Sequence, residues 1–124
     1  MSKHMKILFA LLCLLAPISL VAESTSGTVE SISEEYGNLE TSITLDDINS
    51  LGIQTSDQLL VMYGDQKITT YFGKTYEDVA SGEWISFINW ENKLRIARNH
   101  KNAAKALSAK IGDKLTISKI SNHN

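Results

Sequence analysis

The strongest structural signal in this 124-residue sequence is a predicted β-hairpin, Glu83-Trp-Ile-Ser-Phe-Ile-Asn-Trp-Glu-Asn-Lys-Leu-Arg-Ile-Ala-Arg98. In residues 83–89, large apolar side chains stand at both the odd and the even positions. Successive side chains of a strand point to opposite faces, so this pattern predicts a strand that is buried on both faces. Residues 90–93 form the turn. Residues 94–98 return with alternate apolar side chains on one face, as in a strand that lines a core.

Five more predicted strands flank this hairpin, separated by turn signals such as Gly-Asn and Gly-Asp. These strands are residues 27–33, 39–44, 58–63, 67–72 and 114–119. Residues 102–109 are Ala-rich and give the one clear helix. Asp46 and Asp47 suit the first turn of a short helical segment at 46–50 better than a carboxylate site. The pattern predicts an all-β fold with one short helix, a small seven-stranded antiparallel barrel-like domain.

The N-terminal segment has the order of a secretory signal, basic then apolar then small. Lys3 and Lys6 precede the uncharged apolar run 7–15. That run is shorter than the roughly 20 apolar residues of a membrane helix, although an uncleaved anchor is the alternative. We therefore expect a signal peptide over residues 1–22 and a single periplasmic or secreted domain over residues 23–124, without a membrane attachment after cleavage.

The composition of the expected mature chain excludes several classes of function. Its 10 basic and 14 acidic residues give a formal charge of −4, so it has no general attraction to nucleic acid or anionic lipid. The single cysteine, Cys13, lies in the expected signal, which excludes disulfides and thiol chemistry. His100 and His123 are too far apart for a local metal motif, and no nucleophile motif is present. No catalytic residue, metal ligand or cofactor is predicted.

Two segments carry side chains that suit a ligand. Tyr36, Gly37 and Asn38 place an aromatic ring beside a turn and an amide, a combination that suits a flat heterocycle. The alternative is a structural turn in which Tyr36 plugs the barrel. In the hairpin, Arg98 shares the core face at the strand end, where a charge needs a carboxylate or a ligand as its partner. Arg95 points the opposite way and is expected to be a solvated charge.

At these segments the sequence resembles the C-terminal domain of the S-adenosyl-L-methionine (SAM) hydroxide adenosyltransferases, a family that includes SAM-dependent chlorinases and fluorinases. The family run of an acid, Phe-Gly-Asn-Leu and Thr-Asn-Ile is similar to Glu35-Tyr-Gly-Asn-Leu-Glu-Thr-Ser-Ile43. Further family signatures follow in order at Thr75-Tyr76, Gly82-Glu83, Asn89-Trp90, Leu94-Arg-Ile-Ala97, Asn102-Ala103 and Gly112-Asp113.

The resemblance implies a seven-stranded barrel-like fold with a site for the adenine end of SAM or adenosine, where the domain meets the N-terminal domain of a neighbouring subunit. It assigns that site to Tyr36 in the Phe position, to Asn38 and to Arg98. Two departures stand out: Ser42 replaces an Asn, and Trp90 replaces a Ser. The ring of Trp90 either fills the adenine position or lines the pocket beside Tyr36.

The family's N-terminal domain supplies the aspartates that hold the ribose and orient the water or halide, and the sequence has no segment that resembles it. We therefore expect an exported, non-catalytic binding module for a purine nucleoside or a SAM-like ligand. One alternative is a protein-interaction domain or homo-oligomer with a vestigial nucleoside site. Another is the half-site of a SAM hydrolase-type enzyme that a separate N-terminal-domain partner completes.

Overall fold

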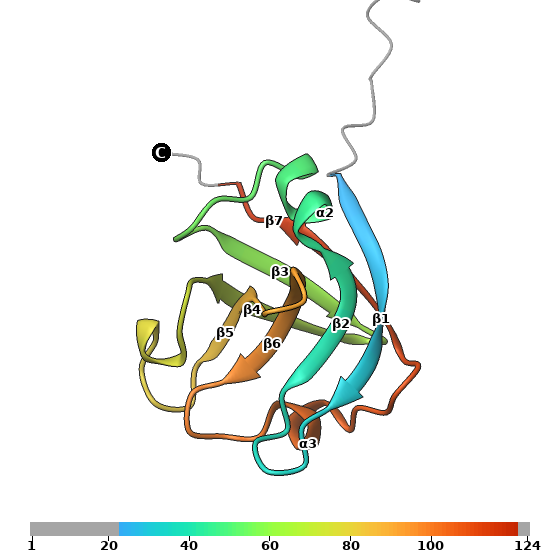
Figure 1. Ribbon diagram of the computed structural model, residues 1–124, viewed down its shortest axis with the longest axis vertical. Helices are drawn as coiled ribbons and strands as arrows, with labels where there is room; N and C mark the ends of the chain where they lie inside the picture. Colours follow the sequence, from blue (N-terminus) through green and yellow to red (C-terminus); the bar gives the residue numbers. More distant parts are fainter. Residues whose placement is uncertain (1–22, 122–124) are drawn as a thin grey trace, which may run out of the picture.

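A computed structural model of the chain describes residues 23–121, which form a closed seven-stranded barrel with the strand order β1-β2-β6-β5-β4-β3-β7 (Figure 1). The strands are β1 (Ser24–Ile32), β2 (Leu39–Thr44), β3 (Gln58–Tyr63), β4 (Gln66–Phe72), β5 (Trp84–Ile88), β6 (Lys93–Arg98) and β7 (Lys114–Lys119). The predicted seven-stranded barrel is thus confirmed. The expected signal peptide lies outside the described residues.

The barrel differs from the expected one at the pairing of β4 with β5. This pair is parallel, with Tyr71 opposite Ile85 and Phe72 opposite Ser86, whereas the other strand pairs of residues 23–121 are antiparallel. Parallel neighbours cannot be joined by a tight hairpin and need a crossover. Residues 73–83, with the 3₁₀ turn η1 (Tyr76–Asp78), form that crossover.

Two short α-helices lie at opposite ends of the barrel, α2 (Leu45–Ser50) after β2 and α3 (Ala103–Leu107) before β7 (Figure 1). The expected helical turn at 46–50 is therefore a second α-helix. Thr44 and Asp47 form its capping box, in which each side chain accepts a hydrogen bond from the other's backbone N–H. No helix within residues 23–121 is long and apolar enough to cross a membrane.

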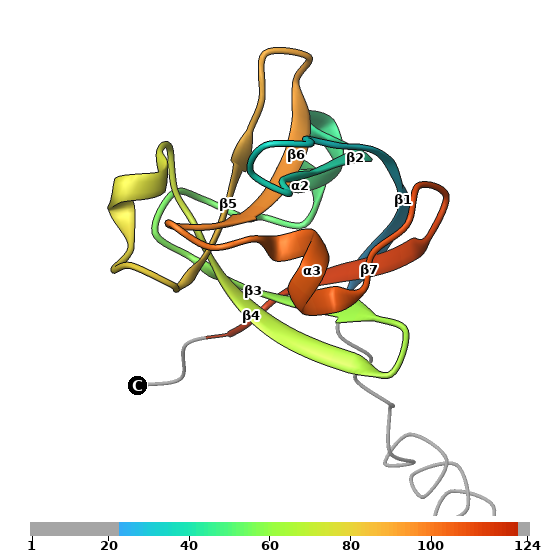
Figure 2. The same ribbon diagram turned by 90° about the horizontal axis from the view of Figure 1, so that it is seen from below.

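The apolar residues form two clusters, one inside the barrel and one on its outer surface. The interior is filled by fully buried aliphatic side chains from the strands, Val29, Leu39, Ile43, Leu59, Val61, Leu94, Ile96, Leu115 and Ile117. On the outer face of β5 and β6, Ile85, Phe87 and Ala97 are buried by Tyr76 and Val79 of the crossover. Figure 2 shows this crossover outside the barrel, next to β5. Both faces of β5 are therefore buried, as predicted.

Candidate functional site

The loop between β1 and β2 is held in one conformation by its own backbone. Gly37 N–H donates to Ser33 O at 2.8 Å, and Asn38 N–H donates to Ser33 Oγ at 2.9 Å. Gly37 has φ +67°, and a Cβ there would overlap the side-chain amide of Asn102. Its carbonyl accepts from Ala104 N–H of α3 at 2.9 Å. Only glycine fits this close approach, which fixes the flanking Tyr36 and Asn38 relative to α3.

This loop forms one wall of a cavity of about 790 Å³. The crossover forms a second wall and the chain after β6 forms a third. The lining residues are Glu35, Tyr36, Asn38, Thr75, Tyr76, Glu77, Arg98, Asn99, His100, Lys101 and Asn102. Three of the four residues that the sequence suggests as ligand-binding, Tyr36, Asn38 and Arg98, therefore border one cavity.

Tyr36 presents an open ring at this cavity, whereas Asn38 is sunk into its wall. Tyr36 is 61% exposed and Asn38 is 5% exposed. The ring therefore does not plug the barrel, which was the alternative for the turn. The hydrogen bond to Glu35 and the negative charge of Glu35 both raise the pKa of Tyr36, so the Tyr36 hydroxyl stays neutral near pH 7.

Arg98 lies at the end of β6, with its side chain half-buried against the cavity. Its Nε donates to Gly82 O at 2.9 Å, and its guanidinium carbon lies 5.4 Å from the centre of the Trp84 ring. Among residues 23–121 no carboxylate forms an ion pair with Arg98. The predicted need for a partner is thus met by a carbonyl and an aromatic face, and the charge remains available to a ligand.

Trp90 does not border the cavity. It is 85% exposed in the β5–β6 turn, whereas Arg98 pairs with Trp84 at the opposite end of the same hairpin. The ring therefore neither fills the cavity nor stacks beside Tyr36. The length of β6 separates Trp90, in the turn, from Arg98, at the far end of the strand.

Arg95 corrects another expectation, because it is not a solvated charge. Its Nε donates to both carboxylate oxygens of Glu40, at 2.6 and 2.8 Å, and its guanidinium lies 5.4 Å from the Phe87 ring centre. The crossover covers this outer face of β5 and β6. Alternation along β6 gives the correct face for Arg95, but it does not reveal that the crossover buries that face.

Tyr76 is a cavity residue that the sequence reasoning did not single out. Its Oη accepts hydrogen bonds from Asn38 Nδ2 at 2.7 Å and from Arg95 Nη1 at 3.2 Å. The signal was present in the Thr75-Tyr76 pair, which matches a family signature. Its position beside Asn38, which lies 38 residues earlier, depends on the crossover.

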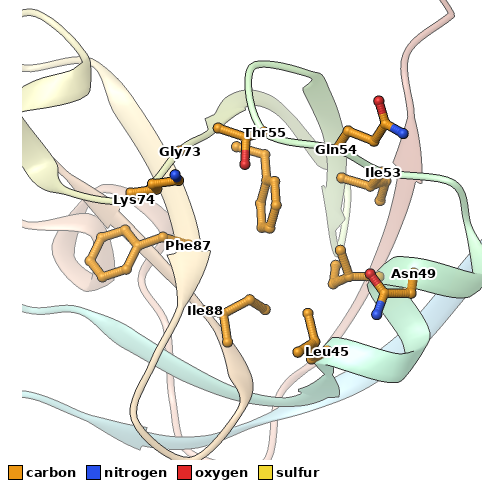
Figure 3. A pocket seen from close by; sticks show the side chains of 11 residues that line it. Leu45, Asn49, Ile53, Gln54, Thr55, Gly73, Lys74, Phe87 and Ile88 are labelled. Atoms are coloured by element: carbon orange, nitrogen blue, oxygen red, sulfur yellow. The ribbon is translucent and has the colours of Figure 1, made fainter.

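A second hollow, of about 480 Å³, lies at the other end of the barrel around α2 (Figure 3). Apolar and polar side chains both line it. The lining residues are Leu45, Ile48, Asn49, Ile53, Gln54, Thr55, Phe72, Gly73, Lys74, Phe87 and Ile88. None of the predicted site residues lies here. Within residues 23–121, neither hollow contains a cluster of three or more metal-ligating side chains.

Comparison with solved structures supports the same fold. An uncharacterized conserved protein from Thermotoga maritima superimposes with a TM-score of 0.73 at 29% identity, over 80% of this chain and 37% of that one. A conserved hypothetical protein from Thermus thermophilus gives a TM-score of 0.55 at 20% identity, over 86% of this chain and 40% of that one, and shows the fold alone. This chain thus spans about two fifths of the length of each of these proteins.

A comparison with sequence-family profiles identifies the same family that the sequence resembles. No curated protein matches the sequence. The profile of the SAM hydroxide adenosyltransferase C-terminal domain matches residues 27–116, which include all or part of every strand of the barrel. The chain belongs to the SAM hydroxide adenosyltransferase C-terminal domain family.

Proposed function

We propose that this domain is a binding module for the base of a purine nucleoside, with adenosine or the adenosyl end of SAM as its ligand. The observation that carries the proposal is one cavity with three complementary groups: the open ring of Tyr36, the buried amide of Asn38 and the guanidinium of Arg98. A flat heteroaromatic base uses all three, since it stacks on a ring, pairs with an amide and lies near a cation.

The proposal concerns binding by this domain rather than a reaction. The family resemblance assigns base recognition to the C-terminal domain, and it assigns the positioning of ribose and nucleophile to the N-terminal domain. A partner that brings such groups to the open side of the cavity would turn the base site into half of an active site. Such a half-site is a second candidate function for the same cavity, and it predicts the same contacts with the base.

The binding proposal is tested by isothermal titration of the purified protein with adenosine, SAM and adenine, in parallel with Tyr36→Ala. A base that stacks on an aromatic side chain gains about 1–3 kcal/mol, so the variant should bind roughly 10- to 100-fold more weakly. Because Tyr36 is largely exposed, its unfolding midpoint in urea should barely change. No wild-type binding at millimolar nucleoside would overturn the proposal and favour a protein-interaction domain.

We also propose that the domain acts outside the cytoplasm, on the strength of Lys3, Lys6 and the apolar run 7–15. Mass spectrometry of the protein from a native host should find a mature N-terminus near Glu23. Full-length chain recovered from the cytoplasm would contradict export and leave the binding proposal intact.

A further inference from the structure

Trp90 is the most exposed large apolar side chain of residues 23–121, and the base-binding proposal gives it no role. Its ring is 85% exposed, whereas Tyr36 and Ile111 are 61% and 68% exposed. Tryptophan side chains are usually well covered in folded proteins. Tryptophan is also enriched among the interface residues that contribute most of the binding energy. Trp90 is therefore a candidate contact for another protein surface.

The β5–β6 turn holds Trp90 in a fixed position. Asn89 Oδ1 accepts hydrogen bonds from Glu91 N–H at 2.9 Å and from Lys93 N–H at 3.1 Å. Asn89 N–H donates to Lys93 O at 2.8 Å, and Asn89 Nδ2 donates to Glu40 Oε1 at 3.2 Å. A ring on a pre-formed turn loses little further freedom when it is buried, so its burial can contribute fully to an interface.

The hollow at the α2 end lies next to this turn (Figure 3). Ile88, which lines the hollow, precedes Trp90 by two residues. Leu45, also in the lining, donates its N–H to Asn92 O in the turn at 2.8 Å. The volume of about 480 Å³ lies in the range of pockets that take organic groups of indole size or larger. The exposed ring and a hollow that could receive such a ring thus lie at the same end of the barrel.

Charges of opposite sign flank the ring and the hollow. Glu91 follows Trp90, Lys74 lines the hollow, and both residues are exposed. Within residues 23–121 neither of them forms an ion pair. A second molecule that places its Trp90 in this hollow therefore brings a negative Glu91 toward a positive Lys74. Exposed pairs of this kind add little affinity, but they fix the register of two surfaces.

We propose that two copies of this chain form a symmetric dimer, in which Trp90 of each copy enters the hollow at the α2 end of the other and Glu91 pairs with Lys74 across the interface. A ring and its receptor at one end of a molecule make a self-complementary patch, which is what a two-fold axis requires. The cavity for the base lies at the opposite, α3 end. The dimer and the base-binding function can therefore fail independently of each other.

Sedimentation equilibrium of the purified protein between about 1 µM and 1 mM tests the dimer. The wild type should be a dimer at 1 mM and release monomers on dilution. Trp90→Ala should raise the dissociation constant at least about 30-fold, as truncation of a central interface tryptophan does. Because Trp90 is 85% exposed, the urea midpoint of the variant should barely change. A wild type that is monomeric at 1 mM, an assembly larger than a dimer, or a dimer that Trp90→Ala leaves intact overturns the proposal.

A charge exchange tests which surfaces meet. Lys74→Glu and Glu91→Lys each bring like charges together at both contacts and should weaken the dimer roughly tenfold. The double variant reverses both charges, so its dissociation constant should return to within about threefold of the wild-type value. A double variant that stays as weak as the single variants contradicts this placement of the ring.

Ile111→Ala is the matched control, because it removes an exposed apolar side chain that does not line the hollow. It should leave the dissociation constant unchanged. Tryptophan emission gives a second readout, since it should shift to shorter wavelengths as the concentration rises, with the same midpoint as the mass. A monomer whose emission is already at short wavelength at every concentration would have its ring folded onto its own hollow, and this result overturns the proposal.

Discussion

The two ends of the barrel are closed by short helices but differ in what those helices cover. At the α3 end, Asn38, Tyr76 and Arg98 bring polar groups into the cavity wall, and each is held by a specific hydrogen bond. At the α2 end, six of the eleven lining residues are aliphatic or aromatic, and the others are glycine or polar. Buried polar groups cost free energy unless they are paired, and these hydrogen bonds pair them, which is why the proposed ligand site lies at this end.

The largest effect should come from the core at the α2 end. Ile48 is completely buried, and Ile48→Ala removes three carbons from a packed site, which should cost about 2–5 kcal/mol of unfolding free energy. Urea melts would measure this loss. The variant should still bind adenosine within about twofold of the wild type, by the additivity of distant sites. A parallel loss of affinity would break the distinction between the two ends.

Glycines with nearly the same backbone angle lie at the two ends and give a matched pair. Gly37 has φ +67° and would clash with Asn102, whereas Gly52 has φ +70° and has nothing within 4 Å of an added Cβ. Gly52→Ala should cost only the backbone strain, about 1–2 kcal/mol. Gly37→Ala should cost about 2–3 kcal/mol, because it also disturbs the Asn102 cap of α3.

The adenosine affinity of the two glycine variants should differ as well as their stability. Gly37→Ala displaces Tyr36 and Asn38, so it should also abolish adenosine binding, and Gly52→Ala should not. Thermal melts together with calorimetric titration would separate the two effects. Equal behaviour of the two variants would show that the loop at the α3 end is not held in the way described.

Two ion pairs test whether the polar contacts near the cavity matter more than surface charge. The Glu40–Arg95 pair is mostly shielded, whereas the side chains of Lys93 and Glu30 are 30% and 43% exposed. Glu40→Ala strands a partly buried guanidinium and should cost about 1–3 kcal/mol. Glu30→Ala should cost less than about 1 kcal/mol and lose even that in high salt. Denaturant melts at two salt concentrations would distinguish them.

The smallest expected effect is a pH dependence of the unfolding free energy, which comes from Asp113, outside both hollows. The hydrogen bonds that Tyr63 Oη and Lys110 N–H donate lower the pKa of Asp113 below its usual value. A lowered folded-state pKa stabilises the protein above about pH 4, and this contribution is lost as the pH falls through the lowered pKa.

Asp113→Asn should therefore make the unfolding free energy fall less steeply as the pH drops below about 4, with no change in adenosine affinity. Urea melts across that range would measure the slope. An unchanged acid slope would show that Asp113 is not coupled to folding.

The fold could be predicted from the sequence because its signals are local. Alternation in residues 83–98 and turns such as Gly64-Asp65 specify the strands, and a chain with seven of them closes into a barrel to remove its edges. The parallel β4–β5 pair could not be predicted in this way. It depends on the path of residues 73–83, which carry no periodic pattern.

The residues of the candidate site also differ in how far the sequence could predict them. Tyr36, Asn38 and Arg98 could be found because a turn motif and a strand face mark them. Trp90 was mistaken for a neighbour because it stands at a family signature, although its place in the 90–93 turn puts it a strand length away from Arg98. Tyr76 is marked by a family signature, but its contact with Asn38 depends on the path of the crossover. The Glu40–Arg95 pair depends on the register of β2 with β6, which the sequence does not show.

The most direct test of the account is an adenosine titration of isotope-labelled protein followed by amide NMR shifts. We expect saturable shifts in residues 35–38, 75–77 and 98–102, and unchanged amides in residues 45–55 around α2. Shifts centred on α2, or no shifts at millimolar adenosine, would contradict the claim that the polar end of the barrel binds the ligand.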